Sequence, residues 1–202
     1  MMCLLIPGRE CPGKDFDVFL QPLVDELQQL WLGVSTFDAL SRRDFDLHAA
    51  VIWCIHDYPG LSTLSSRVTR GYYACVHCDK DPCSKRIRNK ICYIGHRRWL
   101  PHDHPRRKKK DYDGQIEKRE KPHQFSTNEL MQQLERVKEV KPGKHPNNNK
   151  RKRDANDGQC WKKRSCLWDL PYWTDLKLRH NLDVMHIEKI YVSLCLVHFL
   201  LF

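Results

Sequence analysis

Leu47 to Ile55 (LHAAVIWCI) is a nearly continuous apolar run, and it limits the possible folds more than any other stretch of the chain. Its β-branched and aromatic members favour a strand that is buried on both faces, as in the centre of a mixed α/β sheet. The run ends at His56-Asp57-Tyr58-Pro59-Gly60, where proline and glycine stop a strand. An acid at this point is typical of catalytic carboxylates and of ordinary turns, so the run alone leaves both interpretations open.

Helical and strand patterns surround this run. Asp15 to Leu32 has apolar residues at helical spacing, with its acids on the opposite face, and predicts a helix. Ser126 and Glu129 have the spacing of a capping box, followed by an apolar stripe at Leu130, Leu134 and Val137, and predict a second helix. Met1 to Ile6 reads as a buried strand before Pro7-Gly8. Val34 to Asp46 reads as a connector or as a strand with a turn.

A stretch rich in cysteine and histidine runs from Cys75 to His104. Cys75 and Cys78 form a Cys-x-x-Cys pair, and His96, His102 and His104 follow among arginines. Thiolates combined with imidazoles favour tetrahedral zinc, and two cysteines one turn apart are the usual first half of such a site. The alternative is a loop of unpaired thiols beside phosphate-facing basic residues.

The 202 residues suggest one domain, or one domain with appendages, and carry a formal net charge of +10. This charge favours a polyanionic partner, most simply nucleic acid. No secretory signal and no apolar run of the roughly 20 residues that a membrane span needs is present, which predicts a soluble intracellular protein without a membrane segment. Its ten cysteines are then expected to be reduced and available to a metal.

Two basic blocks flank the predicted second helix. Arg106 to Lys110 (RRKKK) precedes it, and residues 141–160, with a KRKR cluster at Lys150 to Arg153, follow it. Proline, glycine and three consecutive asparagines make the second block a predicted linker or disordered loop. Its KRKR cluster fits a nuclear-import signal, a phosphate contact or a solvated charge run.

The segment Trp161 to Lys189 alternates aromatic and basic residues and closes on Asp183, His186 and Glu188. In a helix, Asp183 and His186 would share a face, whereas Glu188 is only two residues beyond His186. The segment alone does not decide between a site and an ordinary helix with exposed charges.

Several separate strings together resemble the transposase of plant CACTA (En/Spm) DNA transposons. They are LLIPG, GKDFDVFLQPLVDELQQLW, IHDYPG, ACVHC, YIGHRRWLPHDHPRR and WKKRSCLWDLPYWTDLKLRHNLDVMHIEK, in that order from Met1 to Lys189. The resemblance implies a nuclear DNA-binding protein with a ribonuclease-H-like catalytic fold, in which acidic residues hold two divalent metals, Mg²⁺ or Mn²⁺, for DNA strand cleavage and transfer.

The resemblance also implies roles for individual residues. Asp57 is the family's second acidic ligand, and Glu188 is the candidate for the last one, with Asp183 as the competing choice. A structural Zn²⁺ would be held by Cys75, Cys78, His96 and His104 in an insertion between these acids. Candidate nucleic-acid contacts are Arg97, Arg98, Arg106, Arg107, Lys108, Lys150, Arg151, Lys152 and Arg153.

The resulting expectation is an α/β chain with a partial ribonuclease-H-like mixed sheet. Its regions are residues 1–60 (partial core), 61–110 (Cys/His basic insertion), 111–160 (helix and disordered basic linker), 161–189 (distal catalytic-region segment) and 190–202 (divergent apolar tail). The family's first catalytic acid has no counterpart here, so we expect a transposase fragment without strand-transfer activity. The alternatives are a zinc-dependent nucleic-acid-binding module without catalysis, and a protein–protein adaptor. The sequence does not indicate an oligomeric state.

Overall fold

The structure is a computed structural model that describes residues 6, 12–87, 89–111, 114–137, 140, 160–185 and 188. The chain divides into two compact units, which are described one at a time. Of the described residues, the first unit contains those up to Ser66, Val140 and those from Lys163 onward, and the second contains residues 67–137 and 160–162.

The first unit is organised around the helix α1 (Phe16–Leu32), which follows the short 3-10 turn η1 (Gly13–Asp15). This confirms the predicted helix. Its apolar stripe buries Leu20, Val24 and Leu27 and packs against the 3-10 turn η4 (Cys166–Asp169). Burying each such side chain stabilises the fold by about 1.5–3 kcal/mol. The helix ends at Gly33, whose φ of 100° is accessible to glycine at little cost.

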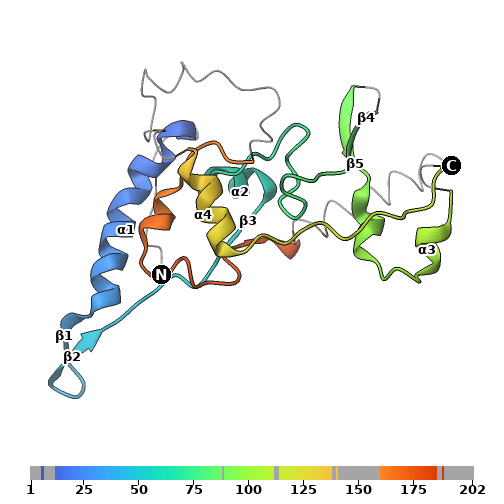
Figure 1. Ribbon diagram of the computed structural model, residues 1–202. Helices are drawn as coiled ribbons and strands as arrows, with labels where there is room; N and C mark the ends of the chain where they lie inside the picture. The colour runs from blue at the N-terminus through green and yellow to red at the C-terminus, as the bar shows by residue number, and fades with distance from the viewer. Residues whose placement is uncertain are drawn as a thin grey trace. The chain divides into compact units, whose positions relative to one another are not determined.

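An exposed hairpin follows α1 directly, at its C-terminal end in Figure 1. Its strands β1 (Val34–Asp38) and β2 (Arg43–Leu47) pair antiparallel, with Val34 opposite Leu47. The Asp38 carboxylate accepts a hydrogen bond of 3.0 Å from the amide N–H of Leu40 and so stabilises the turn. Of the two interpretations of residues 34–46, the strand with a turn is therefore confirmed.

The apolar run from Leu47 to Ile55 does not form one long buried strand, and that prediction was wrong. Leu47 ends β2, residues 48–53 have no regular secondary structure, and β3 is confined to Cys54–His56. Ile55 is 64% exposed. An apolar run indicates a tendency to be buried, but the segments that pack above and below a strand decide whether its two faces are covered. Within the described residues, β3 pairs with a single strand, β6 (His180–Leu182).

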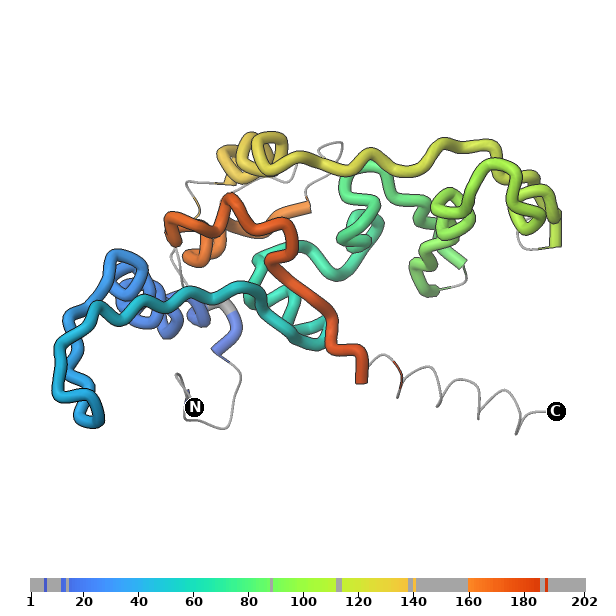
Figure 2. Tube along the Cα trace, turned by 90° about the horizontal axis from the view of Figure 1, so that it is seen from below, coloured from blue at the N-terminus to red at the C-terminus, as the bar shows by residue number. Residues whose placement is uncertain are grey.

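The strands β3 and β6 run parallel, with Cys54 opposite His180 and His56 opposite Leu182. Figure 2 shows the two segments side by side within the first unit. The helix α2 (Tyr58–Leu64) begins directly after β3 and buries Leu61. The pair therefore joins two segments that are far apart in the sequence and leaves both strand ends at the same edge.

The second unit contains a second hairpin, β4 (Ser84–Ile87) and β5 (Lys90–Tyr93), in antiparallel register. Two short helical turns follow it, η2 (Gly95–Trp99) and α3 (Pro105–Lys108). The helix α4 (Thr127–Glu135) confirms the helix predicted after Ser126, including the capping box between Ser126 and Glu129.

Helix α4 contributes to the core of the second unit. Leu134 and Val137 of the predicted stripe are buried. The buried Trp161 ring donates a hydrogen bond of 2.9 Å from Nε1 to the side-chain oxygen of Gln133. The buried indole N–H thereby keeps a hydrogen-bond partner, and the guanidinium of Arg67 stacks on the same ring, 4.7 Å from its centroid.

The described residues form a mixed α/β structure, as predicted, with three two-stranded sheets among them. The predicted strand at Met1–Ile6, apart from Ile6, and residues 141–159 of the predicted linker lie outside the described part. Across the residues that are described, no helix has both the length and the apolar character to span a membrane.

Candidate functional site

Two of the predicted catalytic acids follow neighbouring strands. Asp57 comes directly after β3, and Asp183 comes directly after β6. The amide N–H of Asp183 donates a hydrogen bond of 2.9 Å to the carbonyl oxygen of His56, so the parallel pairing continues to this point. Ligands in open α/β sheets bind outside the carboxyl ends of the strands. The structure therefore brings Asp57 and Asp183 to the edge where a metal or substrate would be bound.

Each of the two carboxylates is oriented by a local backbone hydrogen bond. Asp57 caps α2, because its Oδ1 accepts a hydrogen bond of 2.6 Å from the amide N–H of Gly60. A Cβ at position 60 would lie 2.7 Å from this oxygen, so glycine permits the close approach. Asp183 Oδ1 accepts a hydrogen bond of 3.0 Å from the amide N–H of Met185. In both side chains the Oδ1 atom accepts a backbone hydrogen bond, and the Oδ2 atom can bind a ligand.

A histidine pair lies on the same strands. Nε2 of His56 and Nδ1 of His180 are 3.1 Å apart, and the indole of Trp173 packs edge-on against His180. Burial lowers the pKa of His56, which keeps its imidazole neutral at pH 7. This pair was missed in the sequence, because no spacing rule connects residues on strands that meet only through the fold.

Glu188, the other candidate for the last acid, is exposed. Among the described residues no hydrogen bond or salt bridge joins it to Asp57, and His186 lies outside them. Of the two choices, the geometry thus favours Asp183 as the neighbour of Asp57.

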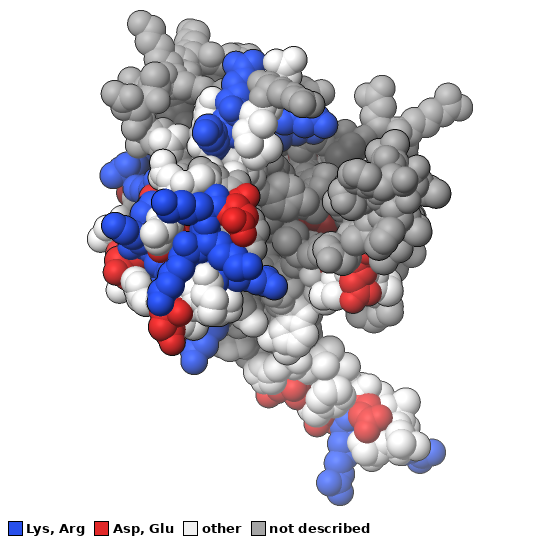
Figure 3. All heavy atoms as spheres, turned by 90° about the vertical axis from the view of Figure 1, so that its right-hand side faces the viewer, with Lys and Arg blue, Asp and Glu red and all other residues white. Residues whose placement is uncertain are grey.

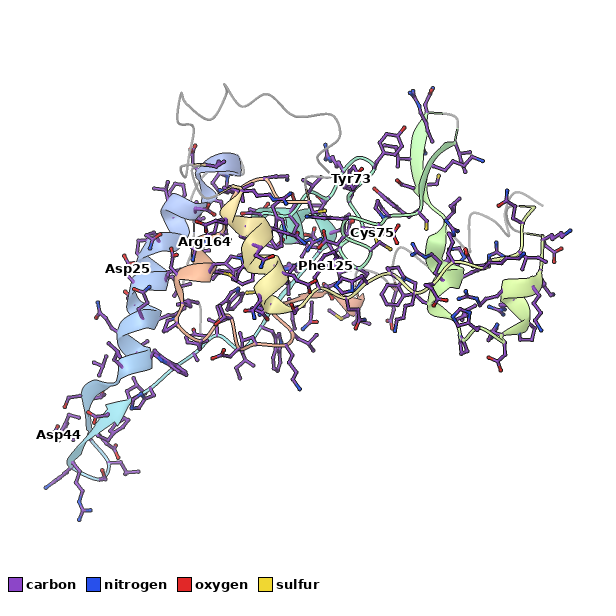
Figure 4. All side chains as sticks on the ribbon, in the orientation of Figure 1. Asp25, Asp44, Tyr73, Cys75, Phe125 and Arg164 are labelled. Carbon is purple, nitrogen blue, oxygen red and sulfur yellow. The ribbon has the colours of Figure 1, made fainter. Side chains whose placement is uncertain are left out.

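The Cys75/Cys78 pair lies on the loop that leads from α2 to β4, where Figure 4 labels Tyr73 and Cys75. The amide N–H of Asp79 donates to the carbonyl oxygen of Cys75 at 3.1 Å, which closes a tight turn around the pair. Burial, followed by the neighbouring Cys75, raises the pKa of Cys78 to about 12. Without a metal, Cys78 is therefore a neutral thiol in contact with its partner.

The two histidines predicted to complete a zinc site have different surroundings. His96 is exposed on η2. His104 caps α3, and its Nδ1 accepts a hydrogen bond of 3.2 Å from the amide N–H of Arg106. In the part of the chain that the structure describes, no group of three or more Cys, His, Asp or Glu side chains is arranged to hold a metal ion. The zinc centre formed by Cys75, Cys78, His96 and His104 stays a prediction.

Three of the predicted phosphate contacts are buried arginines. Arg97, Arg98 and Arg107 are 2%, 6% and 2% exposed. Arg107 donates to the carbonyl oxygens of Arg98 at 3.1 Å, Leu100 at 3.0 Å and Arg119 at 2.6 Å. A guanidinium provides five donors in a fixed geometry, which suits this use.

The other two buried arginines act in the same way. Arg97 donates to the carbonyl oxygen of Lys109 at 2.8 Å, and Arg98 donates to the carbonyl oxygen of Glu120 at 2.7 Å and pairs with Asp81 at 2.5 Å. These arginines connect loops that have few apolar side chains to bury. Their burial and internal hydrogen bonds favour a structural role for Arg97, Arg98 and Arg107, and the phosphate contacts predicted for them stay a prediction.

Exposed basic side chains gather on the face of the second unit that Figure 3 shows. The exposed basic residues of this unit include the predicted contacts Arg106 and Lys108, and also Lys109, Lys110 and Lys118. Lys150, Arg151, Lys152 and Arg153 lie outside the described residues. Of the predicted contacts, Arg106 and Lys108 are thus accessible to a polyanion.

Comparison with known protein families gives a match over most of the chain. Residues 1–137 match the family described as "Transposase family tnp2". No curated protein and no solved structure matches the chain. The matched region includes Asp57, the Cys75/Cys78 pair and the whole basic face, and it ends before β6.

Proposed function

Because the chain belongs to the tnp2 family of transposases, we propose that it is a piece of the catalytic region of a CACTA-type (En/Spm) DNA transposase of plants. On this proposal the first unit derives from a ribonuclease-H-like core. Asp57 and Asp183 are two of the carboxylates that bind Mg²⁺ or Mn²⁺, and DNA is the partner. The protein acts in the nucleus, where its DNA is located.

The observation that carries the proposal is the pairing of β3 with β6, which brings Asp57 and Asp183 to one sheet edge. Carboxylate oxygens are the ligands that Mg²⁺ and Mn²⁺ prefer. In a two-metal site, the bound cations help activate the attacking oxygen and stabilise the leaving one. The chain's own contribution is to hold the two carboxylates through the Gly60 and Met185 amides, so that they need not reorganise to bind a ligand.

We further propose that this chain by itself does not cleave DNA. No described group combines three or more acidic or metal-ligating side chains. Two carboxylates bind a hard cation weakly. A two-metal site that lacks a ligand therefore loses several kcal/mol of transition-state stabilisation. For comparison, removing a single oxyanion-hole donor from an enzyme costs about 3–4 kcal/mol.

The test combines metal binding and DNA nicking. Free Mn²⁺ is measured by electron paramagnetic resonance for the wild type and for Asp57→Asn and Asp183→Asn, with Asp44→Asn on the exposed strand β2 as the matched control. We expect weak binding that both site variants lose and the control keeps. Asparagine is also a good N-cap, so the Asp57 variant keeps α2. Equal Mn²⁺ binding by all four proteins would reject the assignment of the acids.

In parallel, supercoiled plasmid is incubated with the wild type and Mn²⁺, and we expect no nicked product. If nicking occurs and Asp57→Asn abolishes it, the chain is an active nuclease and the proposed inactivity is wrong. If nicking persists in both site variants, it comes from a contaminant or from another site.

A second candidate function is a zinc-dependent nucleic-acid-binding module. The contact between Cys75 and Cys78 in the second unit favours it. In this function the pair provides two thiolates to Zn²⁺, and His96 and His104 complete the site after local rearrangement. Metal analysis of the purified protein is expected to give one zinc, lost in the Cys75→Ser/Cys78→Ser variant and kept in Cys166→Ser. A protein with no zinc as purified, and none after incubation with Zn²⁺, would exclude this function.

A further inference from the structure

The β4–β5 hairpin carries basic side chains that the fold does not use. Lys85, Arg86 and Lys90 are exposed, and none of them forms a salt bridge or a side-chain hydrogen bond among the described residues. This contrasts with the buried Arg97, Arg98 and Arg107, which bond backbone carbonyls of the same unit. The hairpin cations therefore contribute charge to the surface and little to the stability of the unit.

Both faces of the hairpin are basic and open. Directly paired residues share a face, so Lys85, Ile87 and Lys90 lie on one side and Arg86 lies on the other with Ile91. Ile87 is 47% exposed. A hairpin that exposes both faces buries little apolar surface of its own, and an isolated two-stranded hairpin is marginally stable in water. A partner that contacts both faces would supply the missing contacts.

The local charge specifies a polyanion. No Asp or Glu occurs between Cys83 and Asp103, so the hairpin has no acidic neighbours in sequence to neutralise it. Residues 84–121 contain fourteen Lys and Arg against five Asp and Glu, an excess of nine, which is nearly the whole formal net charge of +10. A solvated, self-neutralised face would instead mix both signs.

The base of the hairpin is firmly anchored. The amide N–H of Ile94 donates to the carbonyl oxygen of Cys83 at 2.8 Å, and the hydroxyl of Tyr93 donates to the carbonyl oxygen of Gly71. The Sγ of Cys83 accepts hydrogen bonds from the guanidinium groups of Arg98 at 3.2 Å and Arg119 at 3.0 Å. The hairpin thus extends from a fixed base.

We propose that the β4–β5 hairpin is a ribbon that enters a groove of duplex DNA, with Lys85, Arg86 and Lys90 contacting phosphates on the two sides of that groove. The major groove of B-DNA is wide enough to admit a two-stranded β-ribbon. The inference rests on the proposed function, since it takes DNA as the partner of the chain. It assigns the contact to residues that differ from the buried arginines and from the carboxylates of the first unit.

Duplex DNA fits this hairpin better than a single strand. Sites for single strands combine a basic groove with aromatic side chains on which bases stack. The sole aromatic residue between Ser84 and Tyr93 is Tyr93 itself, and its hydroxyl is engaged at the base of the hairpin. The ring of Tyr93 is 40% exposed but lies at the base of the hairpin, and residues 84–92 have no aromatic side chain on which bases could stack.

The proposal is tested by fluorescence anisotropy with the full chain and a labelled 25-base-pair duplex over a series of salt concentrations. The variant Lys85→Gln/Arg86→Gln/Lys90→Gln is compared with the wild type. The control Arg42→Gln/Arg43→Gln/Lys177→Gln removes the same charge from exposed positions of the first unit. Each lost phosphate contact lowers the slope of log K against log salt by about 0.9, so we expect the hairpin variant to lose about 2–3 units of slope.

We also expect the hairpin variant to bind the duplex at least about tenfold more weakly at 0.1 M salt, with the control within about twofold of the wild type. A single strand of the same length should bind the wild type less tightly than the duplex. Equal slopes for the hairpin variant and the control would overturn the proposal, as would tighter binding of the single strand. Failure of the wild type to bind duplex would also overturn it, and would leave the Mn²⁺ test of Asp57 and Asp183 unaffected.

A second measurement needs no substitution. Lysine amines of the wild type are acetylated with and without duplex and located by mass spectrometry. Lys85 and Lys90 should be protected by the duplex, whereas Lys177 should react equally in both samples. Equal labelling of Lys85 and Lys90 with and without duplex would exclude contact even if the chain binds DNA through other residues.

Discussion

The amide N–H of Asp183 donates a hydrogen bond of 2.9 Å to the carbonyl oxygen of His56, the residue that precedes Asp57. The two aspartates therefore leave one edge of the parallel pair, although they are far apart in the sequence. The side chains of His56 and His180 also contact each other, and this contact connects the same two strands. Every role proposed for the first unit depends on this pairing.

Asp57 should have a structural role as well as its proposed metal-binding role. Because its carboxylate caps α2, Asp57→Ala is expected to lower the free energy of unfolding by about 1 kcal/mol, whereas Asp57→Asn should lower it by a few tenths. Urea unfolding followed by tryptophan fluorescence measures both values. Equal losses for the two variants would mean that the cap is absent in solution.

Arg107 should stabilise the second unit and should not contact DNA. Arg107→Ala removes a buried guanidinium and deprives the backbone carbonyl oxygens of Arg98, Leu100 and Arg119 of this donor, a loss of about 3 kcal/mol or more in the free energy of unfolding. Arg107→Lys is expected to recover little, because an ammonium cannot reproduce the fork of donors. Urea unfolding gives these values.

The neighbouring Arg106 is the matched control, since it is exposed. Arg106→Ala should change the free energy of unfolding by less than about 0.5 kcal/mol. A stable Arg107→Ala protein that loses DNA affinity would contradict the structural role of Arg107.

The capping box of α4 should make stability depend on pH. Hydrogen bonds from the Ser126 backbone and side chain, assisted by His123, lower the pKa of Glu129 from 4.5 to about 2. Since the folded-state pKa is depressed, the stabilisation is fully present above pH 4.5 and is lost as the pH falls toward 2.

The difference in unfolding free energy between the wild type and Glu129→Gln, measured by urea unfolding at several pH values, should therefore shrink across this window. Ser126→Ala should remove the cap at neutral pH at a cost of about 1 kcal/mol. A difference that stays constant down to pH 2 would show that the capping box does not perturb Glu129.

Gly95 should be essential to the anchored base of the β4–β5 hairpin. A Cβ at this position would lie 2.6 Å from the Sγ of Cys83, closer than real contacts allow. Gly95→Ala is expected to cost about 1–3 kcal/mol, as overpacking does, and to weaken duplex binding through the hairpin. Asn89→Ala, at the exposed hairpin turn, serves as the control and should leave the melting temperature unchanged. An unaltered melting temperature for Gly95→Ala would mean that Gly95 does not pack against Cys83 as described.

Local patterns in the sequence predicted the elements whose stabilising contacts are local. Helix α1 followed from the spacing of apolar residues such as Leu20 and Leu27, and the capping box of α4 from Ser126 and Glu129 alone. Both rest on interactions between residues three or four positions apart, which the sequence displays directly. The candidate acid Asp57 was also identified from its position at the end of an apolar run, whereas Asp183 was only the competing choice to Glu188 for the last acid.

Contacts between distant segments could not be predicted in this way. The apolar run from Leu47 to Ile55 indicated burial, but its exposure depended on which distant segments pack against its faces. The buried Arg97, Arg98 and Arg107 were indistinguishable from the exposed Arg106 in a run of basic letters, because a guanidinium binds carbonyl oxygens or phosphates with the same donors. Whether a given guanidinium binds carbonyl oxygens or phosphates depends on whether loops from other parts of the chain bury it.

The sequence by itself therefore determined the local helices, the basic charge, the kind of partner and the family to which the chain belongs. Tertiary structure decided that Asp183 is the neighbour of Asp57, and which arginines are free to meet a polyanion. The physical reason is that hydrogen-bond donors, carboxylates and apolar groups take their roles from the groups they meet, and those groups come from distant parts of the chain.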